Sequence, residues 1–156
     1  MSSRPAAPAR LDLDRFLPYR LSVLSNRVSS AIARHYSEAF GLSVAEWRVM
    51  AVLGQTPGLS ARQVAARTAM DKVQVSRAVA GLMRAKRVSR AGDAKDRRVS
   101  RLSLTRQGMA TYGRIVPSAL RLEEVLLCAL GAEERRIFDR LIDKLTRQAG
   151  LLAPKA

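Results

Sequence analysis

The sequence predicts a mainly α-helical protein of the α+β class, in which one short β-hairpin accompanies the helices. Near both ends of the chain, apolar residues recur every three or four positions, which is typical of amphipathic helices. Three sequences that cap the start of a helix follow one another in the middle of the chain. Two short, partly alternating segments then flank a polar loop, which indicates a two-stranded hairpin.

The first helix is predicted to start at Leu17 and to end at Gly41, which can adopt the left-handed backbone that terminates helices. Pro18 suits the first turn, where a missing N–H costs little. The apolar stripe of this helix comprises Leu21, Leu24, Val28, Ile32, His35 and Ala39. His35 is therefore expected at the centre of the stripe and Arg20 at its edge.

Three short helices are predicted next from their N-terminal caps. The capping pairs are Ser43 with Glu46, Ser60 with Gln63, and Asp71 with Gln74. Leu59 and Met70, which precede the last two caps, can pack on Val64 and Val75. Only a few residues around Ala69 separate the last two helices, and the second of them is the more basic. Together they form the outline of a helix-turn-helix.

The β-hairpin is predicted from strands at residues 87–90 and 99–104, joined by a polar loop at 92–98. A hairpin at this place forms a wing beside the helix-turn-helix. Helical spacing resumes at Thr105 with Pro117 expected to kink the helix, and a final helix starts near Ala132.

The chain is predicted to divide into a disordered lead-in, a DNA-binding domain and a dimerisation region. The lead-in is 1–12, the winged helix-turn-helix is 43–105, and the N- and C-terminal helices at 13–42 and 106–150 form the dimerisation region. The flanking helices have apolar stripes that need a partner, and antiparallel packing against a second copy is the simplest one. A self-contained monomeric bundle is the alternative.

Net charge points to a polyanionic partner. The chain carries 28 basic and 13 acidic side chains, a net charge of +15. Residues 60–107 hold thirteen of the basic and three of the acidic ones, so this segment alone carries +10. Arginine matches phosphate and guanine better than lysine does. A codon bias toward arginine is the alternative explanation of the composition, but it does not explain why the charge is concentrated in one segment.

The helix that starts after Asp71 has two distinct faces. Val75, Val79 and Leu82 are expected to face the core. The opposite face and its flanks are expected to contact DNA in the major groove through Val73, Gln74, Ser76, Arg77 and Arg84. The alternative is a merely solvated basic face.

The tip of the wing is expected to reach the adjacent minor groove through Arg97 and Arg98. Asp96 would be unfavourable next to phosphate, and we interpret it as an ion-pair partner that braces the tip. A solvated turn is the alternative.

These segments resemble the MarR family of winged-helix regulators. The resemblance rests on residues 71–82, on the wing sequence Asp93-Ala94-Lys95-Asp96-Arg97-Arg98, on Leu104-Thr105-Arg106-Gln107-Gly108, and on Leu42, Glu46, Trp47 and Arg48. It implies an obligate homodimer, a palindromic double-stranded DNA operator, and repression that a small ligand relieves. It also implies that Asp96 braces the wing and that Arg98 enters the minor groove. Because members of the family often sense aromatic acids or their coenzyme A thioesters, a ligand pocket is expected near Arg20, His35 and Trp47.

Other function classes find little support in the sequence. One histidine and one cysteine cannot build a typical metal site, and neither a glycine-rich phosphate loop nor a nucleophile elbow is present, so no enzyme activity, metal or cofactor is expected. Cys128 lies among leucines, where burial would blunt its reactivity. No membrane span is recognisable, and a cytoplasmic location is the default expectation. The remaining alternative is an architectural protein that binds DNA of any sequence without an effector.

Overall fold

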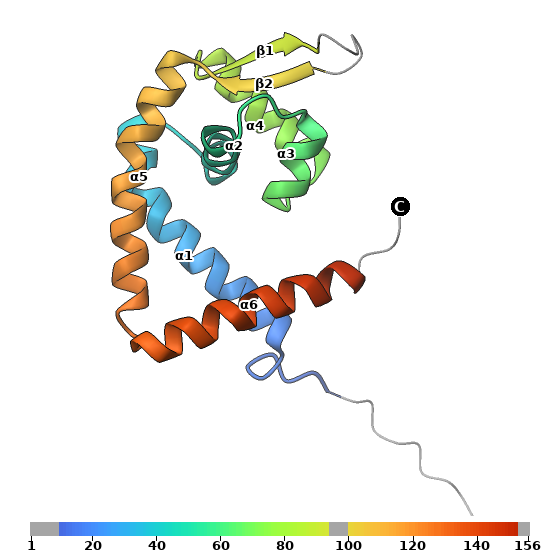
Figure 1. Cartoon of the computed structure of the whole chain (residues 1–156), viewed down its shortest axis with the longest axis vertical. Helices are drawn as coiled ribbons and strands as arrows, with labels where there is room; N and C mark the ends of the chain where they lie inside the picture. The colour runs from blue at the N-terminus through green and yellow to red at the C-terminus, as the bar shows by residue number, and fades with distance from the viewer. Residues whose placement is uncertain (1–9, 94–99, 153–156) are drawn as a thin grey trace, which may run out of the picture. The chain divides into compact units, whose positions relative to one another are not determined.

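The computed structural model of the chain describes residues 10–93 and 100–152 and is mainly helical, with a small antiparallel sheet (Figure 1). The elements in chain order are α1 (Leu17–Phe40), α2 (Val44–Gln55), α3 (Ala61–Thr68), α4 (Lys72–Arg84), β1 (Val88–Gly92), β2 (Ser100–Leu104), α5 (Arg106–Leu127) and α6 (Ala132–Leu152). The predicted fold class is confirmed. The chain forms two compact units, one ending at Ile115 and the other beginning at Val116, so that α5 contributes to both.

Helix α1 has the predicted ends, and Ile32 of the predicted apolar stripe packs against the core, but His35 does not. Gly41 has a φ of 62° and its N–H donates to the Ser37 carbonyl, which closes the helix. His35, expected at the centre of the apolar stripe, is exposed, and Tyr36 is the buried residue of α1. This correction has a physical reason: α2 packs against the face of α1 that carries Tyr36, and helical periodicity alone does not tell which side of a helix a neighbour covers.

All three predicted capping pairs form complete capping boxes. In α2, for example, the Glu46 N–H donates to Ser43 Oγ at 3.2 Å and the Ser43 N–H donates to Glu46 Oε2 at 2.9 Å. The same reciprocal bonds start α3 and α4. Side chains from these helices, from the loops between them and from β2 form the core of the first unit. It includes Leu53, Leu59, Val64, Met70, Val75, Val79, Leu82 and Leu102.

The hairpin is attached to the helix-turn-helix by a third backbone segment. β1 pairs with β2 in antiparallel register from Val88 opposite Leu104 to Gly92 opposite Ser100. Leu59, in the loop between α2 and α3, forms a bridge with Leu102, and the Leu102 N–H donates to the Leu59 carbonyl at 2.8 Å. The wing is thus fixed along β2 to the loop that starts α3, a contact that the sequence did not predict.

The start of α5 depends on two residues of the Leu-Thr-Arg-Gln-Gly segment. The Thr105 hydroxyl donates to the Lys86 carbonyl at 2.7 Å and accepts the Gly108 N–H at 3.0 Å, so it caps the helix. Gly108 is buried against the backbone of Arg87, whose carbonyl oxygen would overlap any β-carbon at position 108. Glycine is therefore required where α5 leaves the hairpin.

The second unit consists of the end of α5 and α6. None of the residues of α6, all of which the structure describes, is buried. Its exposed apolar side chains are Ile137, Phe138, Leu141, Ile142, Leu145, Leu151 and Leu152. Cys128 is also exposed, which corrects its predicted burial, because the leucines that surround it in sequence do not cover it within one chain. Pro117 lies inside α5, one residue after the second unit begins.

Replacing Ala69, in the turn of the helix-turn-helix, by glycine is expected to stabilise the protein. Its φ of 52° is left-handed, which costs an L-residue about 1–2 kcal/mol. Because glycine also gains entropy in the unfolded chain, we expect Ala69→Gly to raise the free energy of unfolding by only about 0.5–1 kcal/mol in urea denaturation. Ala66→Gly, in the exposed interior of α3, is the control and should lower it by about 1 kcal/mol. A destabilised Ala69→Gly variant would contradict the assignment of strain to this turn.

Candidate nucleic-acid interface

Helix α4 presents a buried face to the core and a second face to solvent. Val75, Ala78, Val79 and Leu82 are at most 5% exposed. The predicted DNA-contacting residues on this helix are all exposed: Val73, Gln74, Ser76, Arg77 and Arg84. The structure thus brings these five side chains to the solvent side of one helix, which is the geometry that insertion into a major groove requires.

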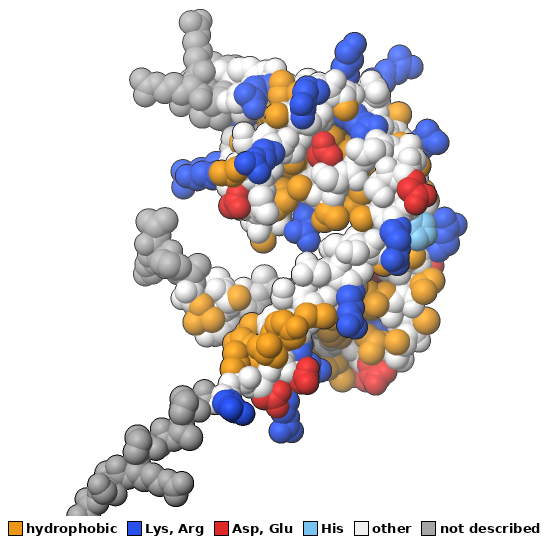
Figure 2. Space-filling model, turned by 180° about the vertical axis from the view of Figure 1, so that it is seen from behind, with side chains coloured by type: hydrophobic (Ala, Val, Ile, Leu, Met, Phe, Trp, Pro, Cys, Tyr) orange, Lys and Arg blue, Asp and Glu red, His pale blue; other side chains and the backbone are white. Residues whose placement is uncertain are grey.

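A shallow groove of about 280 Å³ runs between the start of α2 and this face of α4. Gln74, Arg77 and Arg84 line it from α4, and Ser43 and Glu46 line it from α2. The helices approach closely here because α4 has Gly81 where the Glu46 carboxylate rests, and a β-carbon would overlap that carboxylate. Lys and Arg side chains stand out on the surface around the helix-turn-helix and the hairpin (Figure 2).

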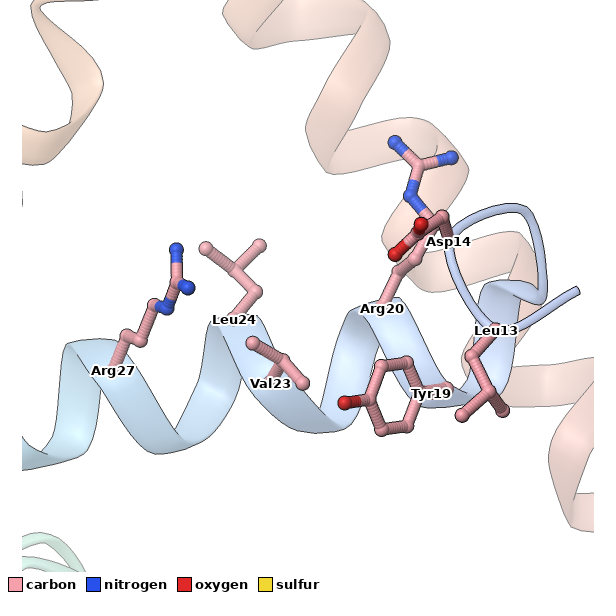
Figure 3. Close-up of a pocket in the computed structure, with 7 residues that line it drawn as sticks. All are labelled: Leu13, Asp14, Tyr19, Arg20, Val23, Leu24 and Arg27. Atoms are coloured by element: carbon pink, nitrogen blue, oxygen red, sulfur yellow. The ribbon is translucent and has the colours of Figure 1, made fainter.

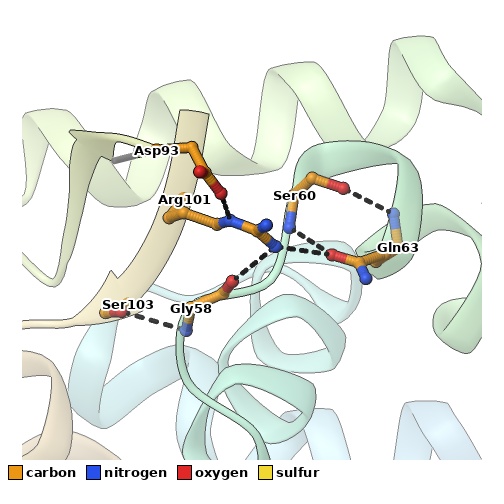
Figure 4. A network of polar contacts seen from close by, with 6 residues as sticks. All are labelled: Gly58, Ser60, Gln63, Asp93, Arg101 and Ser103. Atoms are coloured by element: carbon orange, nitrogen blue, oxygen red, sulfur yellow. Dashed lines mark hydrogen bonds and ion pairs between the residues drawn. The ribbon is translucent and has the colours of Figure 1, made fainter. Parts of the chain in front are cut away.

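The hairpin is braced by an ion pair between Arg101 and Asp93 that was not predicted from the sequence. Arg101 Nε donates to Asp93 Oδ2 at 2.5 Å, and Arg101 Nη1 donates to the Gly58 carbonyl at 3.3 Å and to Gln63 Oε1 at 3.4 Å (Figure 4). The Gly58 N–H donates to Ser103 Oγ at 3.1 Å. Arg101 therefore ties both strands of the wing to the start of α3. The predicted brace Asp96 and the predicted minor-groove residues Arg97 and Arg98 lie outside the described residues.

Loss of this tie should loosen the wing more than the rest of the fold. We expect Arg101→Gln to speed amide exchange in β1 and β2 and to lower the free energy of unfolding by about 1 kcal/mol, because Arg101 is 41% exposed and water screens its ion pair. Arg90→Gln, at an exposed position of β1, is the charge-matched control. Equal exchange in the two variants would show that the network does not hold the hairpin.

In the part of the chain that the structure describes, the three residues predicted to form a ligand pocket lie apart. Arg20 lies in an open surface pocket of about 370 Å³ near the start of α1, with Asp14, Tyr19 and Arg27 (Figure 3). Trp47 lines a separate cavity, and His35 lines neither of these two.

The cavity that contains Trp47 lies between α1 and α2 and measures about 130 Å³. It is lined by Ser29, Ile32, Tyr36, Val44, Trp47 and Arg48. Tyr36 and Trp47 pack with ring centroids 5.5 Å apart, and Trp47 stacks on Tyr112 of α5 at 5.9 Å. Burial raises the pKa of Tyr36, and the nearby charge of Arg48 opposes this shift. Aromatic walls with one guanidinium suit a small aromatic anion. Tyr36 and Arg48 were not predicted as pocket residues, because the helical phase placed His35, and not Tyr36, at the centre of the stripe of α1.

Two further sequence predictions concern metals and membranes. Among the described residues, no three His, Cys, Asp or Glu side chains gather in a group that could hold a metal ion. In the same part of the chain, no helix has the length and hydropathy needed to cross a membrane.

Three comparisons with known proteins point to the same family. Residues 40–99 match the model of the MarR family. A MarR family transcriptional regulator from Silicibacter pomeroyi DSS-3 is 31% identical, with a TM-score of 0.72 over 87% of this chain and 99% of that one. The HTH-type transcriptional regulator BilQ of Clostridium symbiosum (strain WAL-14163) is 28% identical over 74% of this chain and 81% of its own length. The PcaV transcriptional regulator from Streptomyces coelicolor, solved with its natural ligand, is 27% identical, with a TM-score of 0.70 over 90% of this chain and 99% of that one. The protein is a winged-helix, DNA-binding transcriptional regulator of the MarR family.

Proposed function

We propose that this regulator is a cytoplasmic homodimer that represses transcription from a palindromic operator until a small aromatic acid, or its coenzyme A thioester, releases it. The observation that carries the DNA-binding part is the exposed face of α4. Arg77 can read guanine, Gln74 can read adenine, and Val73 can contact a thymine methyl group. The net charge of +10 over residues 60–107 supplies the attraction to phosphate. For the wing tip, Arg97 and Arg98 remain our proposed minor-groove contacts.

Dimerisation is supported by apolar surface that one chain leaves uncovered. The exposed apolar side chains of α6 form one such surface, and Leu17, Tyr19, Leu21 and Leu24 of α1 form another. Figure 2 shows a broad apolar surface next to the start of the described chain. Exposed apolar side chains that gather on one face of a chain indicate an interface. A symmetric dimer would place two α4 helices in successive major grooves, about one helical turn apart.

Ligand release is supported by the cavity between α1 and α2. Arg48 supplies a positive charge for a carboxylate, and Trp47 and Tyr36 supply flat apolar walls. PcaV, which has the same fold, was solved in complex with its natural ligand. A ligand can release the dimer only by binding more tightly to a conformation that does not fit the operator. Of the three residues first predicted for the pocket, Trp47 is the one we retain. Arg20 lines the open pocket near the start of α1, and His35 lines neither of the two cavities.

Selection of bound sequences from a random DNA pool tests this function. We expect an enriched inverted repeat whose half-sites are about ten base pairs apart. The operator so obtained then serves to screen aromatic acids, with benzoate as the first probe, for release of the complex. Tight binding to every sequence without enrichment would instead favour an architectural DNA-binding protein, in which the face of α4 reads no bases.

A further inference from the structure

Arg87 connects two parts of the first unit that are distant in sequence. It is the residue directly before β1, at the base of the hairpin. Its Nη2 donates to the carbonyl oxygen of Phe40 at 2.6 Å, and Phe40 is the last residue of α1. A cation at the end of a helix complements the partial negative charge of the free carbonyls, and charged donors make short, strong bonds. The base of the wing is thereby joined to the end of α1.

The backbone of Arg87 is held just as firmly. Its N–H donates to the Leu82 carbonyl of α4 at 2.8 Å, and its own carbonyl accepts the Thr105 N–H at 3.0 Å, directly after β2. Gly108 of α5 packs on the same carbonyl. One residue therefore touches α1, α4, the residue after β2 and α5, and its side chain is a direct contact between the end of α1 and the base of the wing.

Burial of the Arg87 guanidinium lowers the stability of the fold, so its presence calls for another explanation. Its Nε is buried and has no hydrogen-bond partner among the described residues. A buried donor without a partner costs about 1–3 kcal/mol, and such groups in native proteins call for an explanation. An apolar side chain would fill the same space without this cost, but it could not bind the Phe40 carbonyl.

The other end of this contact leads to the cavity. Ser29, Ile32 and Tyr36 line the cavity from α1, and Phe40 follows Tyr36 by four residues on the same face of the helix. The ring of Phe40 lies under the guanidinium of Arg114, 4.8 Å away, so Phe40 is held by its ring as well as by its carbonyl. A helix moves nearly as a rigid body, so a shift of α1 at the cavity displaces the carbonyl that Arg87 binds.

We propose that Arg87 is a positioning residue for DNA binding, which holds the wing in its binding orientation and carries displacements of α1 to it. The proposal rests on the proposed function, because it assumes that the wing contributes to operator affinity. Arg87 itself, half-buried and bound to Phe40, contacts no DNA in this scheme.

The test compares full-length Arg87→Met and Arg87→Lys with the wild type and with Arg34→Met, a charge-matched control at an exposed position of α1. For Arg87→Met we expect about tenfold weaker operator binding and faster amide exchange in β1 and β2, with exchange in α2 and α4 unchanged. Arg87→Lys keeps a donor for the Phe40 carbonyl and should recover most of the affinity and protection. Arg34→Met should behave as the wild type.

Several results would overturn the proposal. These are wild-type operator affinity in Arg87→Met, an equal loss in Arg34→Met, or faster exchange spread over α2 and α4, which would indicate general destabilisation. If Arg87→Met does not fold, Arg87→Lys decides. Because lysine lacks the planar fork of the guanidinium, a small remaining increase in exchange that is confined to β1 and β2 supports the proposal, and wild-type exchange there overturns it. If the wild type selects no operator, the proposed function fails, whereas exchange in β1 and β2 tests the joint without DNA.

Discussion

Gly108→Ala should lower the free energy of unfolding by about 3 kcal/mol or more, the upper range for overpacking. An alanine β-carbon would overlap the Arg87 carbonyl oxygen, which is backbone and already accepts the Thr105 N–H. Neither partner can move without separating α5 from the hairpin, so the clash cannot be relieved by rotating a side chain. Urea denaturation followed by circular dichroism measures the loss.

Gly113→Ala is the matched control in the same helix. Open space surrounds this position, and alanine should raise the free energy of unfolding by about 0.5–1 kcal/mol, because glycine is a poor helix former. The difference between the two variants isolates the close approach at Gly108 from helix propensity. If both variants were stabilised, α5 would not approach the hairpin as closely as the structure places it.

Arg77→Ala should weaken binding to the selected operator by about 1–3 kcal/mol, or roughly five- to 150-fold, and should relax the preference at one base of each half-site. Arg77 is exposed on α4, the helix that we propose enters the major groove, so alanine removes the guanidinium without a core defect. Binding to unrelated DNA should fall much less, because many other cations contact phosphate. Titration of both DNAs at one fixed salt concentration measures the two losses.

Arg140→Ala, exposed on α6, controls for the change in net charge and should leave the ratio of specific to non-specific affinity unchanged. Equal losses of specific and non-specific binding in Arg77→Ala would remove Arg77 from base reading and leave it as a phosphate contact.

The features that the sequence predicted best are local ones. A capping box joins residues three apart, so the pairs at Ser43, Ser60 and Asp71 could be recognised without knowledge of the tertiary fold. The two faces of α4 were also predictable, since the apolar side chains of one face repeat with the helical period and the other face carries arginine.

The contacts that the sequence did not predict join residues far apart. Leu59 and Leu102 are 43 positions apart in the sequence, and Arg87 and Phe40 are 47 positions apart. The periodic pattern of apolar residues in a helix or strand says nothing about contacts over such separations. The error at His35 has a different cause. Apolar residues occur on more than one side of α1, and only the position of α2 decides that Tyr36 is buried within one chain while other apolar residues stay exposed.

The stacked rings of α1, α2 and α5 give the protein a built-in optical probe. Trp47 is the only tryptophan of the chain, it contacts Tyr36 and Tyr112, and it borders the cavity between α1 and α2. Light absorbed selectively by the indole therefore reports on one place in the molecule. Its emission follows the polarity and packing of that cavity without any label, so effector screening and movements of α1 can be monitored on the unmodified protein.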